Sequence, residues 1–191
     1  IDKVRKKVQN VKLPCSIEEK IAVRAYTGNK VYKAMNKAWW QYDKTGSVQV
    51  LNDVSNTSTV LSQAIGSLPC TSKKAKKIEV KLYRGRGGSS AAEIAKSQTP
   101  GTIVRWPAFT STTINKDVAT SWARGGIVYT VTNVSEMYGA YIKPLSKYPS
   151  EEEVLLDKGI QLEVVSNIKG TGSTPTRIEL RFIGKSEGKP S

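Results

Sequence analysis

The sequence of 191 residues contains no histidine, two cysteines and no long apolar run. Without histidine, the chain has no imidazole to bind a metal ion, to complete a Ser-His-Asp triad or to activate a nucleophilic cysteine. Cys15 and Cys70 are too few for a structural zinc site, and the sequence leaves open whether they form a disulfide or stay as thiols. No stretch reaches the ~18 apolar residues of a membrane helix, and no signal-peptide pattern is present. The sequence therefore predicts neither a metal site nor a membrane span.

The net charge is strongly positive, at +14. This excess predicts attraction to an acidic partner and does not choose among nucleic acid, an anionic membrane surface, an acidic protein and a phosphorylated small molecule. The densest basic run, residues 73–77, has no interleaved aromatic residues for base stacking, so we interpret it as a solvated turn. Length and composition indicate one globular domain. Because the chain begins Ile-Asp-Lys, we expect it to be a piece of a larger polypeptide.

Helical signals are concentrated in the first third of the chain. A basic lead-in over residues 1–15 has little pattern and precedes Ser16, which is an N-cap residue with acids in the following turn. Apolar spacing then predicts helices up to Gly28, over 31–40 and over 59–67, with an irregular loop over 43–58.

Short strand-like runs follow from residue 78 onward. The expected strands cover 78–83, 102–106, 109–113, 126–131, 139–142, 153–156, 161–165 and 178–183, with short helices over 91–96 and 116–122. The strands at 153–156 and 161–165 are expected to pair, the last strand to close the sheet, and the tail from 185 to fray. Helices first and strands after them indicate an α+β fold rather than a doubly wound one.

Three carboxylates stand where a turn enters an apolar strand. A tight turn at Pro149 leads through Glu151, Glu152 and Glu153 into the apolar residues 154–156. Strand alternation predicts that Glu151 and Glu153 share one face. Two close carboxylates repel each other unless a cation or ligand lies between them. The alternative is a solvated acidic cap on an edge strand.

Two further segments carry groups that bind anions or orient carboxylates. Arg84 ends a strand-like run and precedes Gly85, which suits a guanidinium presented to a phosphate or carboxylate. Residues 110–113 are four consecutive hydroxyl residues, which can hydrogen-bond a neighbouring carboxylate. The alternatives are a surface ion pair for Arg84 and an ordinary edge strand for the hydroxyl residues.

Taken in order, these three segments resemble the Arg/Ser-Thr-Ser/Glu-x-Glu signature of mono-ADP-ribosyltransferases, in particular the bacterial exotoxin branch that includes the binary actin-modifying toxins. The resemblance extends over roughly residues 16–166. Further matching segments are Tyr26-Thr27-Gly28 with Tyr32 and Asn36, Leu82-Tyr83-Arg84-Gly85, Pro107 to Thr112, and Gly139-Ala140-Tyr141-Ile142.

This resemblance implies a fold and a set of roles. It implies two packed antiparallel sheets with a cleft that binds NAD as a substrate, without a metal, in a single catalytic domain over 1–191. Glu153 would stabilise the oxocarbenium-like transition state, and Glu151 would orient or deprotonate the acceptor. Ser111 would orient Glu153, and Arg84 would hold an NAD phosphate. A glutamate at the position of Glu151 goes with arginine acceptors in this family.

The remaining implied positions are assigned by the same resemblance. Tyr148 would recognise the target, and the other expected NAD contacts are Gly85, Thr112, Thr113, Arg124, Tyr26 and Asn36. The sequence departs from the signature at Thr113, which replaces a serine, and at Glu152, an additional acid. If the chain were aligned with the family signature one residue differently, Glu152 would be the catalytic acid. The apolar run that directly follows Glu153 argues against this alignment.

The implied activity is transfer of ADP-ribose from NAD to an arginine of a target protein, with release of nicotinamide. Actin or a small GTPase is an expected kind of target, an immunity protein is an expected partner, and the chain is expected to be secreted or delivered into a target cell as part of a larger toxin. Two alternatives keep the fold: transfer to RNA or DNA, which the positive charge favours, and hydrolysis of NAD by water. A basic binding module without activity is a fourth alternative.

Overall fold

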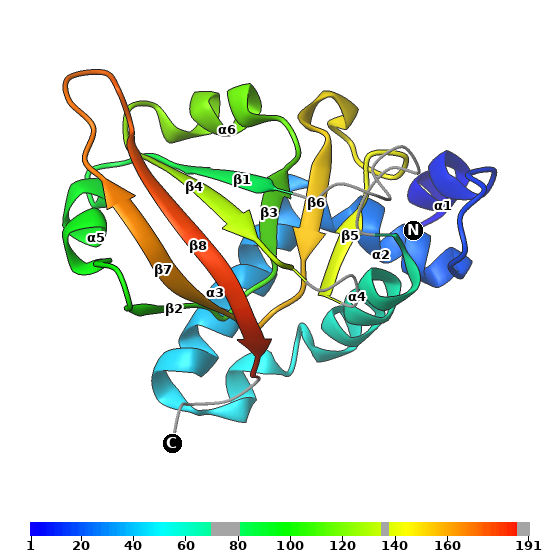
Figure 1. Cartoon of the computed structure of the whole chain (residues 1–191). Coiled ribbons are helices and arrows are strands. Elements are labelled where there is room, and N and C mark those ends of the chain that lie inside the picture. Colours follow the sequence, from blue (N-terminus) through cyan, green and yellow to red (C-terminus); the bar gives the residue numbers. More distant parts are fainter. Residues whose placement is uncertain (70–80, 135–137, 187–191) are drawn as a thin grey trace.

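The computed structural model describes residues 1–69, 81–134 and 138–186, in which α1 to α4 precede one long sheet and α5 and α6 lie between its strands in the sequence (Figure 1). The helices are α1 (Asp2–Val8), α2 (Ile17–Tyr26), α3 (Asn29–Thr45), α4 (Ser55–Ser67), α5 (Ala91–Ser97) and α6 (Lys116–Ala123), with 3-10 turns η1 (Val48–Leu51) and η4 (Pro149–Glu151). The strands are β1 (Leu82–Arg86), β2 (Ile103–Trp106), β3 (Thr110–Thr113), β4 (Ile127–Thr132), β5 (Gly139–Tyr141), β6 (Glu153–Leu156), β7 (Ile160–Ile168) and β8 (Thr176–Lys185). The predicted α+β class is confirmed.

The sheet is continuous but narrows at one point. Its strand order is β2-β7-β8-β4-β1-β3-β6-β5, and its neighbours are antiparallel except for the parallel pair β4 and β8. The number of sheets differs from the two packed antiparallel sheets that were expected, because hydrogen bonds between β1 and β3 join both parts into one sheet. They are joined at a single residue pair, Tyr83 with Thr113, between β1 and β3. The sheet thus has a five-strand half and a three-strand half, β3-β6-β5, that separate beyond this pair.

Apolar burial on both faces of β6 explains why its sequence is a continuous apolar run. Leu155 faces a core cluster made with the N-terminal helices, which contains Tyr26 and Phe109. Val154 and Leu156 face a second cluster, within the curve of the sheet. A strand buried on both faces has no alternating polar positions, so β6 is fixed in place by packing from two sides.

The helical region is more regular than the sequence predicted. Ser16 caps α2 with a complete capping box, as its N-cap position predicted. The lead-in was expected to lack regular structure, but it forms α1, whose Val8 is 1% exposed against the core. The predicted loop over 43–58 is also wrong, because α3 continues to Thr45 and α4 already begins at Ser55.

The sheet differs from the prediction in the pairing of two strands and in the extent of a third. The strand at 153–156 does not pair with that at 161–165, since β6 lies between β3 and β5 while β7 lies between β2 and β8. The last strand does not close the sheet but lies in its interior. Arg84 was expected at a strand end and instead lies in the middle of β1, which continues to Arg86. Each of these differences depends on hydrogen bonds between strands that are far apart in the sequence.

Some predicted features lie outside the described residues: the basic run 73–77, the start of the strand at 78–80, Cys70 and the end of the tail. Cys15 is a free cysteine. None of the described helices is both long enough and apolar enough to cross a membrane.

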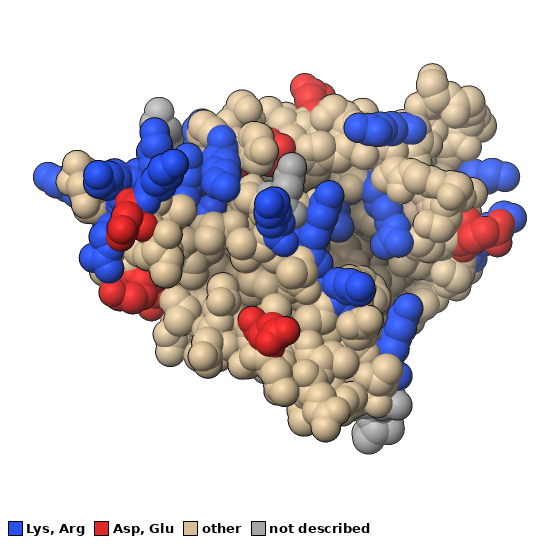
Figure 2. Space-filling view, turned by 180° about the vertical axis from the view of Figure 1, so that it is seen from behind, with Lys and Arg blue, Asp and Glu red and all other residues tan. Residues whose placement is uncertain are grey.

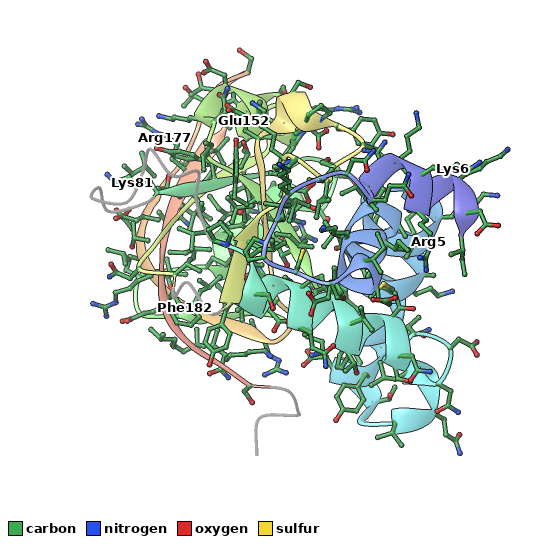
Figure 3. The ribbon with its side chains drawn as sticks, turned by 90° about the vertical axis from the view of Figure 1, so that its right-hand side faces the viewer. Arg5, Lys6, Lys81, Glu152, Arg177 and Phe182 are labelled. Carbon is green, nitrogen blue, oxygen red and sulfur yellow. The ribbon has the colours of Figure 1, made fainter. Side chains whose placement is uncertain are left out.

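Positive charge is spread over several faces. Figure 2 shows Lys and Arg side chains at one end of the molecule and around a hollowed part of the face seen there. In Figure 3, Arg5 and Lys6 project from α1 on one side, whereas Lys81 and Arg177 project on the opposite side. Among the described residues, this distribution differs from the single basic stripe along a groove that tracks a nucleic-acid backbone.

Candidate active site

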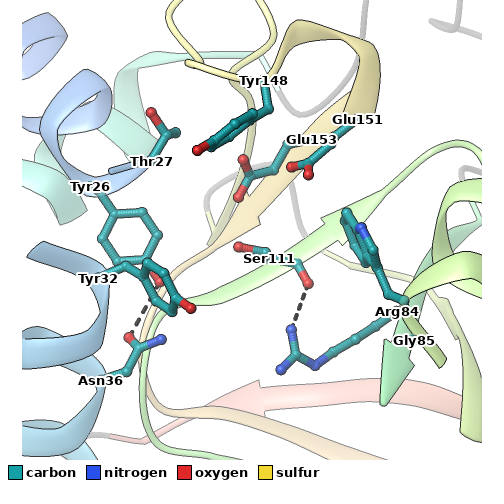
Figure 4. A pocket seen from close by; sticks show the side chains of 11 residues that line it. Tyr26, Thr27, Tyr32, Asn36, Arg84, Gly85, Ser111, Tyr148, Glu151 and Glu153 are labelled. Atoms are coloured by element: carbon teal, nitrogen blue, oxygen red, sulfur yellow. Dashed lines mark hydrogen bonds between the residues drawn. The ribbon is translucent and has the colours of Figure 1, made fainter. Parts of the chain in front are cut away.

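A cavity of about 310 Å³ opens where β1 and β3 separate, and α2, α3, α6 and the turn before β6 complete its walls. It is lined by Tyr26, Thr27, Tyr32, Asn36, Arg84, Gly85, Ser111, Trp122, Tyr148, Glu151 and Glu153. Figure 4 shows the two glutamates and Tyr148 on one side of the cavity, the tyrosines of the helices on another, and Arg84 across from them. The cavity thus brings together most of the residues that the three sequence segments singled out.

Glu153 is a buried carboxyl group at the edge of this cavity. It is the first residue of β6, pairs with Thr113 of β3 and is 4% exposed. The pKa of Glu153 is raised to about 7, mainly by burial and also by the charge of the nearby Glu151, while hydrogen bonding to Ser111 and the charge of Arg84 act in the opposite direction. Such a group changes charge near neutral pH, which is characteristic of catalytic acids and bases.

Glu151 and Glu153 reach the same cavity for a reason other than strand alternation. Glu151 lies in η4, outside the strand, and Glu152 adopts a left-handed conformation with φ 46°. This residue reverses the backbone, so that the Glu152 side chain forms an ion pair with Lys143 at 3.3 Å while its two neighbours line the cavity. The hydroxyl of Thr113 donates to the Glu151 carbonyl oxygen at 2.7 Å and so holds the turn against β3. Burial raises the pKa of Glu151 as well.

Arg84 spans the gap between the two halves of the sheet. Its Nη1 donates to the carbonyl oxygen of Ser111 at 2.8 Å, a side-chain bond where the strands no longer pair. Its guanidinium carbon lies 5.8 Å from the centre of the Trp106 ring, which suits a cation–π contact. Desolvation by the surrounding protein lowers the pKa of Arg84. The guanidinium is therefore held in place and has donors left for an anionic ligand.

Gly85 allows α6 to lie directly on β1. A Cβ atom at this position would be 1.9 Å from the Ala119 carbonyl oxygen and 2.5 Å from the Ala123 nitrogen, which are backbone atoms that cannot move aside cheaply. Close backbone approach is thus the reason for glycine here. The contact brings Trp122 of α6 to the cavity wall.

The helical wall is attached to the sheet through Tyr26. Its hydroxyl lies 3.1 Å from the Phe109 carbonyl oxygen and 3.3 Å from Asn36 Oδ1, and either oxygen can accept its one proton. The ring is 2% exposed and meets the rings of Phe109 and Tyr32 edge to face, with centroids 5.8 and 6.3 Å away. Burial raises the pKa of Tyr26, so its hydroxyl stays a neutral donor. Tyr26 and Asn36 therefore hold α2 and α3 beside β3.

Three residues expected to contact NAD do not line the cavity. Thr112 is fully buried and donates to the Val154 carbonyl oxygen at 2.6 Å. Thr113 supports the turn at Glu151, as described above, and Arg124 is an exposed residue at the C-terminal cap of α6. Alternation along β3 explains the first case, because Ser111 and Thr112 point to opposite sides.

Three lining residues were absent from the predicted site. Thr27 and Tyr32 belong to a segment that matched the family pattern, so a signal for them was present in the sequence. Trp122 had no such signal, because its place depends on the contact between α6 and Gly85. Within the described residues, no group of three or more His, Cys, Asp or Glu side chains is arranged to hold a metal ion.

Comparisons with known proteins identify the family of this chain. The family model for the ADP-ribosyltransferase exoenzymes matches residues 4–184. The NAD(P)(+)–arginine ADP-ribosyltransferase 2 of Gallus gallus is 31% identical over 170 residues, which cover 88% of this chain and 50% of the relative. The chain therefore spans about half the length of this curated relative.

Two solved structures share the fold. Exoenzyme S of Pseudomonas aeruginosa, in complex with human 14-3-3 protein beta and bound to carba-NAD, has a TM-score of 0.67 at 23% identity over 94% of this chain and 80% of its own. The ADP-ribosyltransferase Vis of Vibrio splendidus, in complex with agmatine, has a TM-score of 0.66 at 20% identity over 96% of this chain and 82% of its own. Since the family model covers nearly the whole chain, this protein belongs to the ADP-ribosyltransferase exoenzyme family.

Proposed function

We propose that this chain transfers ADP-ribose from NAD to an arginine side chain of a target protein and releases nicotinamide. The observation that carries the proposal is the pair Glu151 and Glu153, which line one cavity together with Arg84. Relatives named as arginine ADP-ribosyltransferases, and similar structures that hold a NAD analogue or the guanidinium compound agmatine, support it. NAD is a substrate in this proposal, and no metal takes part in it.

The residues suit cleavage of the bond between nicotinamide and ribose. Arg84 binds a phosphate of NAD through charge-assisted hydrogen bonds. When the glycosidic bond breaks, its electron pair goes to the pyridinium ring, which leaves as neutral nicotinamide, and positive charge develops on the ribose. The ionised carboxylate of Glu153, oriented by Ser111, stabilises that charge.

Glu151 suits the second half of the reaction. A guanidinium nitrogen of the acceptor forms the new bond to C1 of the ribose, and Glu151 accepts the proton that this nitrogen loses. Glu151 lies on the same turn as Tyr148, whose ring is 47% exposed at the mouth of the cavity. A carboxylate beside an aromatic ring binds a guanidinium by an ion pair and by cation–π attraction, which favours arginine as the acceptor.

Changing Glu151 to glutamine is expected to separate the two halves of the reaction. Transfer of labelled ADP-ribose to agmatine should fall by about 100-fold or more, because the base for the acceptor is lost. Nicotinamide release to water should stay within severalfold, since Glu153 and Arg84 are unchanged. Both rates are measured with labelled NAD, and Glu152→Gln is the matched control, because Glu152 pairs with Lys143 and does not line the cavity.

The same assay on a cell lysate, separated into protein and nucleic-acid fractions, decides among the alternatives. Label in protein supports the proposal. Label in nucleic acid would support RNA or DNA as the acceptor, and nicotinamide release without label in either fraction would support a NAD glycohydrolase. If the wild-type chain consumes no NAD under any of these conditions, the proposed function is wrong.

The rate is expected to depend on pH through Glu153. Only the ionised carboxylate stabilises positive charge, and the pKa of this group is about 7 in the free protein. We expect kcat/KM for NAD to rise about tenfold per pH unit below pH 7 and to level off above it, because kcat/KM reports ionisations of the free enzyme. The profile is measured from pH 5 to 9 by nicotinamide release. A profile that stays flat between pH 5.5 and 8 would contradict an essential Glu153 carboxylate.

We propose further that residues 1–191 form one catalytic domain of a larger toxin, secreted or delivered into a target cell. The sheet that joins its two halves and the similarity to bacterial toxins and effectors support this organisation. The target protein, for which actin or a small GTPase is the first kind to test, and an immunity protein as a partner are part of the same proposal.

A further inference from the structure

The segment that leads into the acidic turn is attached to the end of helix α2. Arg24, in the last turn of α2, donates from Nη1 to the carbonyl oxygen of Leu145 at 3.3 Å and to that of Ser146 at 2.5 Å. Leu145 and Ser146 are buried, so water is a poor substitute for these bonds. A guanidinium bonded to two consecutive carbonyl groups fixes both the position and the direction of the chain where it leaves the core.

A second residue at the same helix end completes the attachment. Thr27, the C-cap of α2, donates its hydroxyl to the Arg24 carbonyl oxygen at 2.9 Å and accepts from the Lys147 backbone nitrogen at 3.1 Å. The next backbone nitrogen, that of Tyr148, donates to the Ser146 hydroxyl at 3.0 Å. Thr27 and Tyr148 both line the cavity, and Figure 4 shows them near each other. The backbone is therefore held by hydrogen bonds up to Tyr148.

Beyond this point the turn crosses solvent until it reaches Glu151. Residues 148–150 are exposed, and in the described part of the chain no hydrogen bond joins them to another helix or strand. At the far end, the Thr113 hydroxyl holds the Glu151 carbonyl oxygen to β3. The turn that carries Tyr148 and Glu151 is thus attached at its two ends, to α2 through Arg24 and Thr27 and to β3 through Thr113.

Arg24 acts on one side of the cavity only. It is not among the residues that line the cavity, and within the described residues its guanidinium forms no ion pair. Its donors are therefore directed to the two carbonyl groups and not to a carboxylate. Glu153, by contrast, is held in β6 by its pairing with β3. Loss of the Arg24 bonds would consequently move Tyr148 and Glu151 while Glu153 stays in place.

We propose that Arg24 is a positioning residue for the acceptor half of the reaction. By holding the chain before Tyr148 against α2, it sets where Tyr148 and Glu151 meet the guanidinium of the acceptor. This inference rests on the proposed function, because it needs an acceptor beside Glu151. Since a displacement of about 1 Å at a reacting group can lower a rate by about 100-fold, loss of this attachment reduces transfer and spares the cleavage of NAD.

The first test compares two rates in the same protein. In Arg24→Gln, kcat/KM for transfer of labelled ADP-ribose to agmatine is expected to fall about 10- to 100-fold, while nicotinamide release to water stays within about twofold. Arg24→Lys keeps a charged donor for the carbonyl groups, so transfer should fall only about two- to fivefold. Arg177→Gln, which changes an exposed arginine of β8, is the control for the loss of one positive charge.

The second test follows the attachment without any reaction. A protease that cuts after lysine can cleave after the exposed Lys147, whereas the bond after Lys143 is protected by Pro144. Arg24→Gln is expected to speed cleavage after Lys147 by about fivefold or more, because local opening becomes easier. Cleavage after the exposed Lys96 of α5 should not change. Mass spectrometry of the fragments measures both rates.

Several results would overturn the inference. Equal losses of transfer and nicotinamide release in Arg24→Gln would do so, as would unchanged transfer or unchanged cleavage after Lys147. Thermal unfolding checks that each variant is folded, and if Arg24→Gln is not, an unchanged ratio of transfer to release in Arg24→Lys overturns the role. A wild type that consumes no NAD overturns the proposed function as well. A wild type that transfers ADP-ribose beside an unaffected Arg24→Gln overturns only the role of Arg24.

Discussion

Changing Glu153 to glutamine is expected to lower nicotinamide release by about a thousandfold. Glutamine keeps the size of the side chain and its hydrogen-bonding capacity but not the negative charge that faces the developing cation. Loss of a single preorganised electrostatic contact in a catalytic site typically costs 100- to 1,000-fold in kcat, and here the lost group is a full charge on a side chain that is only 4% exposed. Single-turnover release of nicotinamide from labelled NAD measures the effect.

The stability of this variant is the control that separates chemistry from folding. The folded-state pKa of Glu153, about 7, is higher than the unfolded value of 4.5. Below pH 4.5 the carboxyl is protonated in both the folded and the unfolded state and does not lower the free energy of unfolding. Above pH 7 it is ionised in both states and lowers the free energy of unfolding by about 3 kcal/mol. The contribution of Glu153 to the free energy of unfolding of the wild type therefore decreases as the pH rises from 4.5 to 7.

Glu153→Gln should consequently be more stable than wild type at pH 8 and about equal to it near pH 4.5, in urea unfolding at both pH values. Glu152→Gln should keep wild-type nicotinamide release within about twofold. If Glu153→Gln retained more than a tenth of the wild-type rate, or if Glu152→Gln lost as much activity, the assignment of the catalytic carboxylate would be wrong.

Changing Asp157 to asparagine is expected to destabilise the fold by about 3–5 kcal/mol. The Asp157 side chain is 5% exposed and lies 2.9 Å from Nζ of Lys185 and 4.0 Å from Nζ of Lys158. It also accepts from the Ser62 hydroxyl at 2.7 Å and from the Lys158 backbone nitrogen at 2.8 Å. These contacts join α4, the turn after β6 and the end of β8. An asparagine would remove the negative charge that both ammonium groups approach.

Urea unfolding at pH 7 measures this loss, which corresponds to a fall in the unfolding temperature of about 10 °C for a domain of this size. Glu93→Gln is the matched control. Its ion pair with Lys96, at 2.8 Å, has side chains that are 75% and 71% exposed. We expect it to change stability by less than about 0.5 kcal/mol, because exposed pairs contribute little. A loss below about 1 kcal/mol for Asp157→Asn would contradict a stabilising role for the buried cluster.

The sequence was most informative where structure is local. The N-cap at Ser16, the glycine after α2 and the apolar run of β6 each depend on a few neighbouring residues, and these features appear in the fold at the expected places. The grouping of Arg84, Ser111 and the glutamates came instead from the resemblance to a family, whose motifs carry information on distant contacts.

What the sequence did not show depends on contacts between distant segments. Neither the single residue pair between β1 and β3 nor the interior position of β8 leaves a periodic pattern in the chain. The arrangement of the acidic turn is instructive, because Glu151 and Glu153 do line one cavity, but through the left-handed Glu152 rather than through strand alternation. Likewise, Trp122 enters the cavity only because glycine at position 85 lets α6 approach.

The contact of α6 with Gly85 has a mechanical consequence. The backbones of β1 and α6 are in direct contact at Gly85, so we expect the two elements to move as one rigid unit. This unit carries both Arg84 and Trp122. Glu153 belongs to the other half of the sheet, which is hydrogen-bonded to the first at one residue pair and through Arg84 to Ser111, and which packs with it in the second core cluster. The few hydrogen bonds between the two halves therefore help to set the spacing of Arg84 and Glu153 across the cavity.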